Sequence, residues 1–238
     1  MSEQVAVQTT PSNRLIITLG LVATICGVLI VGAFESTRNA IAENKRITLE
    51  RAVFKVLPGA ANVVEYVATT SGVQPLNGGT VPEGGVKLYG AYDQTGTLKG
   101  IAAEAASKGY ADLVQILYGY DVSCQCIVGI SVVSMRETPG IGDRILTDKA
   151  FLKNFEALDV HLNGDMTALA NAVKTVKHGT KTNPWQIDAI AGATVTSKAV
   201  GRGINESVQK LLPLLVPHFN DVKQAPVNAP APGKGTQT

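Results

Sequence analysis

Residues 188–201, "DAIAGATVTSKAVG", join the end of a short apolar segment to the start of a helical pattern. The preceding "WQIDAI" at 185–190 is typical of a short strand. Beyond the stretch, apolar residues at helical spacing predict a helix from about Thr196 to Leu212, ended by Pro213. The residues between strand and helix are mostly small or carry a hydroxyl, so a strand-to-helix turn is expected there.

Two interpretations of this turn are open. Thr196 or Ser197 can act as an N-cap that accepts a hydrogen bond from the first helical turn. Alternatively, the unpaired N–H groups at the helix N-terminus can bind a phosphate, helped by the positive end of the helix dipole. Gly192 and Ala193 would leave room for such a group. The N-cap interpretation accounts for one hydroxyl and leaves Thr194 unexplained.

A second unusual segment, "ETPGIGDR" at 137–144, directly follows the predicted strand "VGISVVS". Pro139-Gly140 is a turn signature, and Gly142 allows another group to approach the backbone closely. An ordinary strand-to-helix loop explains this segment as well when it is considered alone.

Residues 15–34, "LIITLGLVATICGVLIVGAF", contain no charged side chain. At about 1.5 Å per residue, a helix of this length spans the roughly 30 Å hydrocarbon core of a bilayer. A cleaved signal peptide is the alternative, with "VGA" at 31–33 as the cleavage site, but its apolar region is usually only about 7–15 residues long. We therefore expect one retained transmembrane helix near the N-terminus.

The charges around this segment bear on its orientation. Arg14 is the basic residue on its N-terminal side, whereas Arg38, Lys45, Arg46 and Arg51 follow it. Because positive charge concentrates on the cytoplasmic side, this distribution favours a cytoplasmic position for the rest of the chain.

Composition argues against two classes of function. The formal net charge is +2 and the basic residues are scattered, so no nucleic-acid partner is expected. Cys124 and Cys126 would point to opposite faces of a strand, and the three histidines are isolated in sequence. No metal site is therefore expected.

The rest of the chain mixes strands and helices. A helix at 36–57 is expected to end at Pro58-Gly59, and residues 219–238, rich in proline, alanine and glycine, are expected to be disordered. Between them the patterns predict a loop at 76–86, a hairpin at 87–105, strands at 112–121 and 124–134, and helices at 148–157 and 166–176. The expected fold class is α+β, with a mainly antiparallel sheet and flanking helices.

Both unusual segments resemble signatures of one family. "AGATVTSKAV" resembles the S/T-G-A-T flavinylation motif, and "ETPGIGDRI" resembles the E-T-P-G-L-G signature, of an FMN-binding domain. This domain occurs in the G subunit of the Rnf complex and in the C subunit of the sodium-pumping NADH:quinone reductase, and the "GDRI" ending is closer to the Rnf version. The resemblance spans roughly residues 12–215. It implies an N-terminal segment at 1–14, a transmembrane helix at 15–34 and an FMN-binding domain at 35–218.

The resemblance also implies the residues of a cofactor site. FMN would be joined through its phosphate to Thr194 by a flavin transferase that uses FAD as donor, and Asp188 would belong to the motif that this transferase recognises. The backbone N–H groups of Val195, Thr196 and Ser197 would contact the phosphate. The expected cofactor-binding residues are Glu137, Thr138, Gly140, Gly142, Asp188, Gly192, Ala193, Thr194, Val195, Thr196 and Ser197.

Two positions depart from the family's pattern. Ala191 stands where the motif has Ser or Thr, a position at which members vary. Met135 stands where many Rnf members have a histidine, so a flavin-tuning role of that histidine does not carry over.

As a function, the resemblance implies a membrane-embedded flavoprotein electron carrier in an Rnf-type ion-translocating ferredoxin:NAD⁺ oxidoreductase. Such a protein would work with the A, B, C, D and E subunits, have no catalytic residue of its own and be inactive alone. It would cross the inner membrane once, with the FMN domain in the periplasm, contrary to the charge distribution. The alternatives are the C subunit of the quinone reductase, a stand-alone flavinylated carrier, and a cofactor-free tethered binding module.

Overall fold

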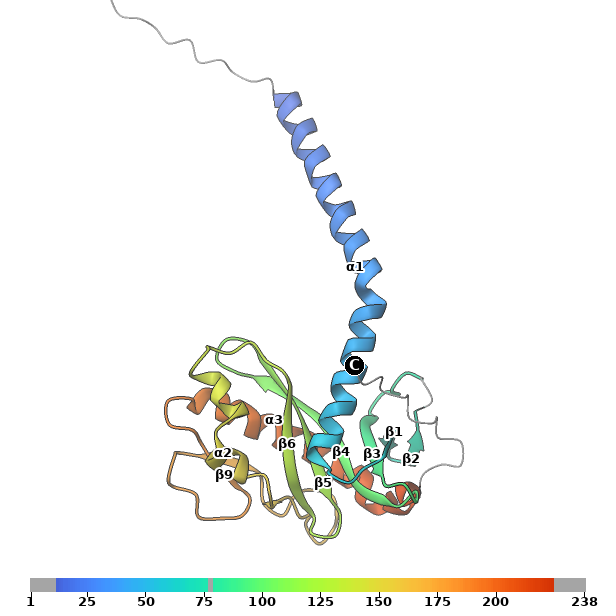
Figure 1. Cartoon of the computed structure of the whole chain (residues 1–238), viewed down its shortest axis with the longest axis vertical. Helices are drawn as coiled ribbons and strands as arrows, with labels where there is room; N and C mark the ends of the chain where they lie inside the picture. The colour runs from blue at the N-terminus through green and yellow to red at the C-terminus, as the bar shows by residue number, and fades with distance from the viewer. Residues whose placement is uncertain (1–11, 77–78, 225–238) are drawn as a thin grey trace, which may run out of the picture. The chain divides into compact units, whose positions relative to one another are not determined.

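The computed structural model describes residues 12–76 and 79–224, and the chain divides into two units, 1–47 and 48–238 (Figure 1). Helix α1, Ser12–Val56, is continuous from the apolar segment through the helix expected at 36–57. In the described part of the chain it is the one helix long and apolar enough to cross a membrane. The helix continues without a break past residue 35, the expected start of the FMN-binding domain, and the second unit begins at Thr48.

The second unit is built on a seven-stranded antiparallel sheet with the strand order β2-β1-β3-β4-β5-β6-β7. The β3–β4 hairpin and the following two strands confirm the sequence prediction, whereas β1 and β2 were not predicted. The strands are β1 Asn62–Thr69, β2 Gly72–Pro75, β3 Val86–Tyr92, β4 Leu98–Lys108, β5 Leu113–Asp121, β6 Cys126–Ser134 and β7 Leu158–Asp159. With the helices, this sheet confirms the α+β class.

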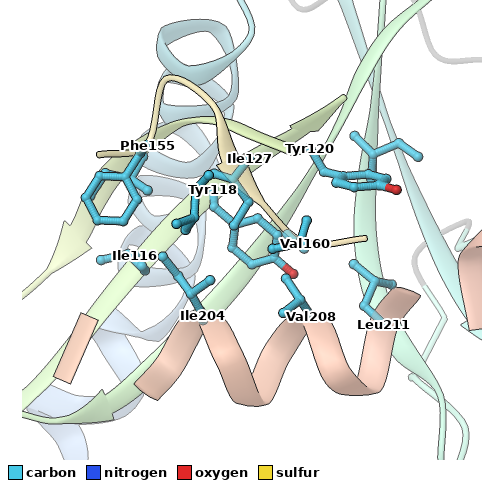
Figure 2. Packing of buried hydrophobic residues seen from close by; sticks show 14 of the residues in the cluster. Ile116, Tyr118, Tyr120, Ile127, Phe155, Val160, Ile204, Val208 and Leu211 are labelled. Carbon is cyan, nitrogen blue, oxygen red and sulfur yellow. The ribbon is translucent and has the colours of Figure 1, made fainter. Parts of the chain in front are cut away.

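Both faces of the sheet are covered by helix. Helix α3, Thr194–Leu215, packs on one face, and Figure 2 shows Ile204, Val208 and Leu211 directed toward the strands that carry Tyr118 and Ile127. The last turns of α1 cover the other face with residues that pack in a second cluster: Leu49, Ala52, Val53 and Val56. The largest buried cluster thus lies between the sheet and α3, and it fixes where α3 begins.

The segment predicted as a helix at 166–176 is not helical. The side-chain oxygen of Asn163 accepts hydrogen bonds from the N–H groups of Thr167 and Ala168, and Met166 has a positive φ of 56°. These side-chain bonds replace the helical ones. The end of the segment forms β8, Lys174–Val176, which pairs in parallel with β9, Gln186–Asp188.

The two other predicted helices differ in length from expectation. The helix expected at 148–157 is limited to α2, Lys149–Lys153, with Asp148 as its N-cap. A short 3₁₀ helix, η1, occupies Gly142–Leu146 before it. Pro213 does not end α3, which continues to Leu215 and into a second 3₁₀ helix, η2, Val216–Val222.

The first residues of the tail predicted to be disordered, 219–224, are structured. Val222 is fully buried, its carbonyl accepts a hydrogen bond from the Tyr92 hydroxyl at 2.8 Å, and Gln224 forms a β-bridge with Thr97. Residues 219–224 are therefore part of the folded unit. The rest of the predicted tail, 225–238, lies outside the described residues.

Cys124 and Cys126 form a disulfide, so the expectation that they point to opposite faces of a strand is wrong. The strand β6 begins only at Cys126, and Cys124 lies in the preceding turn. Gln125 between them has φ +48°, which bends the chain so that the two sulfur atoms meet.

Tyr66, Tyr92 and Val222 form a chain of hydrogen bonds. We predict that removing the Tyr92 hydroxyl lowers the free energy of unfolding more than removing the Tyr66 hydroxyl. The Tyr66 and Tyr92 hydroxyls lie 2.6 Å apart, and burial, followed by the Tyr66 bond, raises the pKa of Tyr92. Tyr92→Phe leaves the Val222 carbonyl without a donor, so we expect a loss of about 2 kcal/mol in the free energy of unfolding, against about 1 kcal/mol for Tyr66→Phe.

Chemical denaturation of both variants, with Tyr110→Phe as an exposed control, measures these losses. Equal stability of Tyr92→Phe and wild type would contradict the anchoring of residues 219–224.

Candidate functional site

A cavity of about 370 Å³ lies at the N-terminal end of α3. Three segments far apart in sequence line it: the β4–β5 turn, the "ETPGIG" loop and the turn before α3. Its lining residues are Tyr110, Glu137, Thr138, Ile141, Gly142, Gly192, Ala193, Thr194, Val195 and Thr196. The structure therefore brings the two segments singled out from the sequence into one site.

The start of α3 differs from the N-cap interpretation. The N-cap is Ala193, three residues before Thr196 and four before Ser197, and no side chain of the described residues caps the helix. The Thr196 hydroxyl instead donates to Glu137 at 2.6 Å. The hydroxyl of the fully buried Ser197 accepts from the Ile190 N–H at 3.1 Å and donates to the Ala193 carbonyl at 2.9 Å.

The Ser197 hydroxyl thus stabilises the turn through these two buried hydrogen bonds. The backbone N–H of Ser197 also donates to the Ala193 carbonyl, at 2.9 Å. The Ser197 N–H, which was expected to contact the phosphate, is therefore used within the turn in this structure. Within the described part of the chain, the N–H groups of Thr194, Val195 and Thr196 have no acceptor. These three donors are the ones that face a ligand at the helix start.

Thr194 is the first residue of α3 and is half-buried in the cavity wall. Its hydroxyl has no hydrogen-bond partner among residues 12–76 and 79–224. Before it, Gly192 has φ +85°, a conformation that residues with a side chain rarely adopt. Arg144 donates to the Ala191 carbonyl at 3.1 Å and so holds this glycine turn from the η1 side.

Glu137 joins all three segments of the cavity wall. One carboxylate oxygen accepts from the Ala111 N–H at 3.1 Å and from the Asp112 N–H at 3.4 Å. The other accepts from the Tyr110 N–H at 3.2 Å and from the Thr196 hydroxyl. Glu137 therefore holds the three segments of the cavity wall together, and its expected contact with a cofactor stays a prediction.

The ionised form of Glu137 is favoured. Burial raises the pKa of Glu137, but the hydrogen bonds from Thr196 and from the three backbone N–H groups outweigh it and lower the pKa below its ordinary value of 4.5. Gly142 is required beside it, because a Cβ at that position would lie 2.6 Å from the Glu137 Cβ and 3.2 Å from the Thr196 Oγ1.

Asp188 and Gly140 do not line this cavity. Asp188 belongs to β9, accepts from the Gly179 N–H at 2.7 Å and lies 3.6 Å from the His178 ring. It lines a smaller neighbouring cavity of about 70 Å³ behind the glycine turn. Gly140 has φ +75° and shapes the turn that carries Ile141 into the cavity wall.

Sequence reasoning missed two exposed apolar residues of the site, Tyr110 and Ile141, and it named Val195 only for its backbone N–H. The exposed fractions are 72% for Tyr110, 50% for Ile141 and 48% for Val195. Tyr110 carries no local signal, because it reaches the cavity only through the β4–β5 turn. The half-buried Trp185 does not line the cavity.

These residues fit FMN. The cavity volume lies in the range of small-molecule sites. Exposed apolar side chains suit the flat isoalloxazine ring, and the unpaired N–H groups at the start of α3 suit a phosphate. Among the described residues, no lysine or arginine lines the cavity.

Comparison with known proteins identifies the family. Residues 109–209 match the model of the FMN-binding domain, and this range contains every residue that lines the cavity. The G subunit of an ion-translocating oxidoreductase complex of Pseudomonas aeruginosa is 30% identical over 200 residues, which cover 80% of this chain and 84% of the relative. The chain belongs to the family of G subunits of ion-translocating oxidoreductase complexes.

A second member of this family supports the assignment. The G subunit of the Na⁺-translocating ferredoxin:NAD⁺ oxidoreductase complex of Acetobacterium woodii is 30% identical, covering 65% of this chain and 70% of the relative. The fold is also that of the C subunit of the Na⁺-translocating NADH-quinone reductase of Parabacteroides distasonis, with a TM-score of 0.57 and 16% identity. That match covers 74% of this chain and 96% of the other.

The bonds of Glu137 predict a pH-dependent loss of stability on its replacement. In Glu137→Gln the amide nitrogen cannot accept from the backbone donors, so we expect a loss of about 1–2 kcal/mol in the free energy of unfolding at pH 7.

Because the folded-state pKa of Glu137 is lowered, this contribution is complete above pH 4.5 and is lost as the pH falls through the folded-state value. Denaturation at several pH values measures the difference, with the exposed Glu156→Gln as control. A difference that grows as the pH falls would contradict the assignment.

Proposed function

We propose that the chain is the covalently flavinylated electron carrier of an ion-translocating oxidoreductase complex, with FMN attached through a phosphoester to Thr194. The observation that carries this proposal is the Thr194 hydroxyl, which is unpartnered within the described residues and lies in the wall of the cavity beside unpaired helix N–H groups. A covalent link makes retention of the cofactor independent of its affinity. FMN supplies the redox chemistry, and the chain supplies its position and surroundings.

The roles of the chain around FMN follow from the contacts. The N–H groups of Thr194, Val195 and Thr196 hold the phosphate, and the side chains of Tyr110 and Ile141 limit access of water to the ring. Glu137 keeps the wall in place through its four hydrogen bonds. Gly192 and Ala193 leave the approach to the Thr194 hydroxyl open.

Asp188 serves maturation rather than cofactor binding in this account. It lies outside the cavity, on the preceding strand, where its carboxylate is tied to the Gly179 N–H. A flavin transferase that recognises the turn from outside would contact this side. The transferase is therefore the partner to which we assign Asp188, as the sequence resemblance implied.

The function of the complex is proposed from the relatives that are G subunits. We assign the chain to an Rnf-type ferredoxin:NAD⁺ oxidoreductase, working with its A, B, C, D and E subunits and inactive alone, with sodium or proton as the coupling ion. The likeness to the quinone reductase protein is one of fold, whereas the 30% identical relatives are both G subunits. A cofactor-free binding module is disfavoured by the open cavity at Thr194.

We further propose that α1 anchors the chain in the inner membrane and that the FMN domain faces the periplasm. The Cys124–Cys126 disulfide supports this side, because disulfides persist in oxidising compartments and are rare in the cytosol. The basic residues after the apolar segment oppose it. Because the disulfide belongs to the folded domain itself, we give it more weight than the basic residues in assigning the side of the membrane.

Intact-mass measurement tests the attachment. Wild-type chain produced with the flavin transferase gains the mass of one FMN. Thr194→Ala gains none, since the acceptor oxygen is gone, while Thr196→Ala keeps the gain because its hydroxyl is committed to Glu137. Loss of the mass in Thr196→Ala with retention in Thr194→Ala would move the site to the other threonine, and an unmodified wild type would refute the proposal.

Protease treatment tests the orientation separately. In spheroplasts with an intact inner membrane, an added protease is expected to digest the domain from the outside. Full protection until the membrane is opened, with a known periplasmic control protein digested in the same sample, would place the domain in the cytoplasm.

A further inference from the structure

The Cys124–Cys126 disulfide contributes little to holding the fold together. It encloses a single residue, Gln125, and the strands on either side are already paired, with Asp121 opposite Cys126. A disulfide stabilises mainly by restricting the unfolded chain, and the effect is smallest for the shortest loops. A structural function therefore does not account for this bond.

The bond is placed where a thiol can reach it. Cys124 is exposed at the tip of the β5–β6 hairpin, whereas Cys126 is buried with 7% of its surface exposed. Gln125 holds φ +48°, an uncommon conformation for a residue other than glycine, asparagine or aspartate. A hollow of about 400 Å³ lies beside the turn, lined by Leu98, Phe219 and residues 121–123.

From this geometry we propose that Cys124–Cys126 is a thiol–disulfide exchange site that accepts two electrons from a dithiol reductant. A thiolate of the dithiol attacks the exposed Cys124 sulfur. The Cys124–Cys126 bond breaks, a mixed disulfide forms at Cys124, and the Cys126 thiolate leaves and takes a proton. The second thiol of the reductant then displaces the Cys124 thiolate, which is protonated, and the reductant is left as a disulfide.

The exchange site is separate from the proposed FMN site. The cavity wall includes Tyr110 in the turn that precedes β5, and the disulfide follows the other end of the same strand. At about 3.4 Å per residue, the nine residues of β5 separate the two by roughly 25–30 Å. Loss of flavin in Thr194→Ala is therefore expected to leave the exchange reaction unchanged, so each proposal can fail without the other.

The rate at which dithiothreitol reduces the folded protein tests whether a thiol can reach the Cys124–Cys126 disulfide. The full chain in detergent, with Cys26→Ser to remove the remaining thiol, is treated with dithiothreitol, and free thiols are trapped by alkylation and counted by mass. We expect reduction of the folded protein within about tenfold of the rate in guanidinium, and a melting temperature changed by less than about 3 °C on reduction. Reduction only after unfolding, a larger loss of melting temperature, or two free thiols in the untreated protein would overturn the proposal.

A matched pair of variants tests which sulfur is attacked. In the Cys26→Ser background, Cys126→Ser leaves the exposed Cys124, and Cys124→Ser leaves the buried Cys126. With oxidised glutathione, we expect the Cys124 thiol to form a mixed disulfide at least about tenfold faster than the Cys126 thiol. Equal rates in two variants of equal melting temperature would contradict attack at Cys124. If one variant fails to fold, the reduction kinetics of the intact disulfide decide the proposal.

Discussion

The site depends on one carboxylate. The Glu137 carboxylate accepts hydrogen bonds from three backbone N–H groups of the β4–β5 turn and from the hydroxyl of Thr196 at the start of α3. Because these segments are distant in sequence, no local preference would keep them together. With the carboxylate ionised and saturated by donors, the wall is set before any cofactor arrives, and the cost of ordering it is met during folding.

The sequence of the turn before α3 indicated a candidate site, but the hydrogen bonds of the turn could not be predicted from it. The small residues at 192–193 and the unexplained hydroxyl of Thr194 left a phosphate site open beside an N-cap, and the resemblance to the FMN-binding domain favoured the phosphate site. The hydrogen bonds that the Thr196 and Ser197 hydroxyls form could not be predicted, because their partners are the distant Glu137 and the buried backbone of Ile190. Backbone donors have no signature in sequence, so such contacts appear only once the fold places them.

The same distinction applies to the fold. The β3–β4 hairpin was predictable because strand and turn signals lie next to each other at residues 86–108. The segment at 166–176 has helical apolar spacing, yet side-chain bonds from Asn163 to the backbone prevent the helix. The disulfide was missed because Gln125 adopts a conformation that its residue type does not suggest. The predictions failed where side chains compete with the backbone for hydrogen bonds, and where the backbone conformation brings two residues together.

The central claim is that the hydroxyl of Thr194 carries FMN because, within residues 12–76 and 79–224, it is unpartnered beside unpaired helix N–H groups. Trypsin cleavage after Lys181 and Lys198 yields a peptide of residues 182–198 that contains Thr182, Thr194, Thr196 and Ser197. Fragmentation of this peptide from flavinylated protein locates the modification. The account predicts FMN on Thr194 alone, and FMN on any of the other three hydroxyls, or on a different peptide, would contradict it.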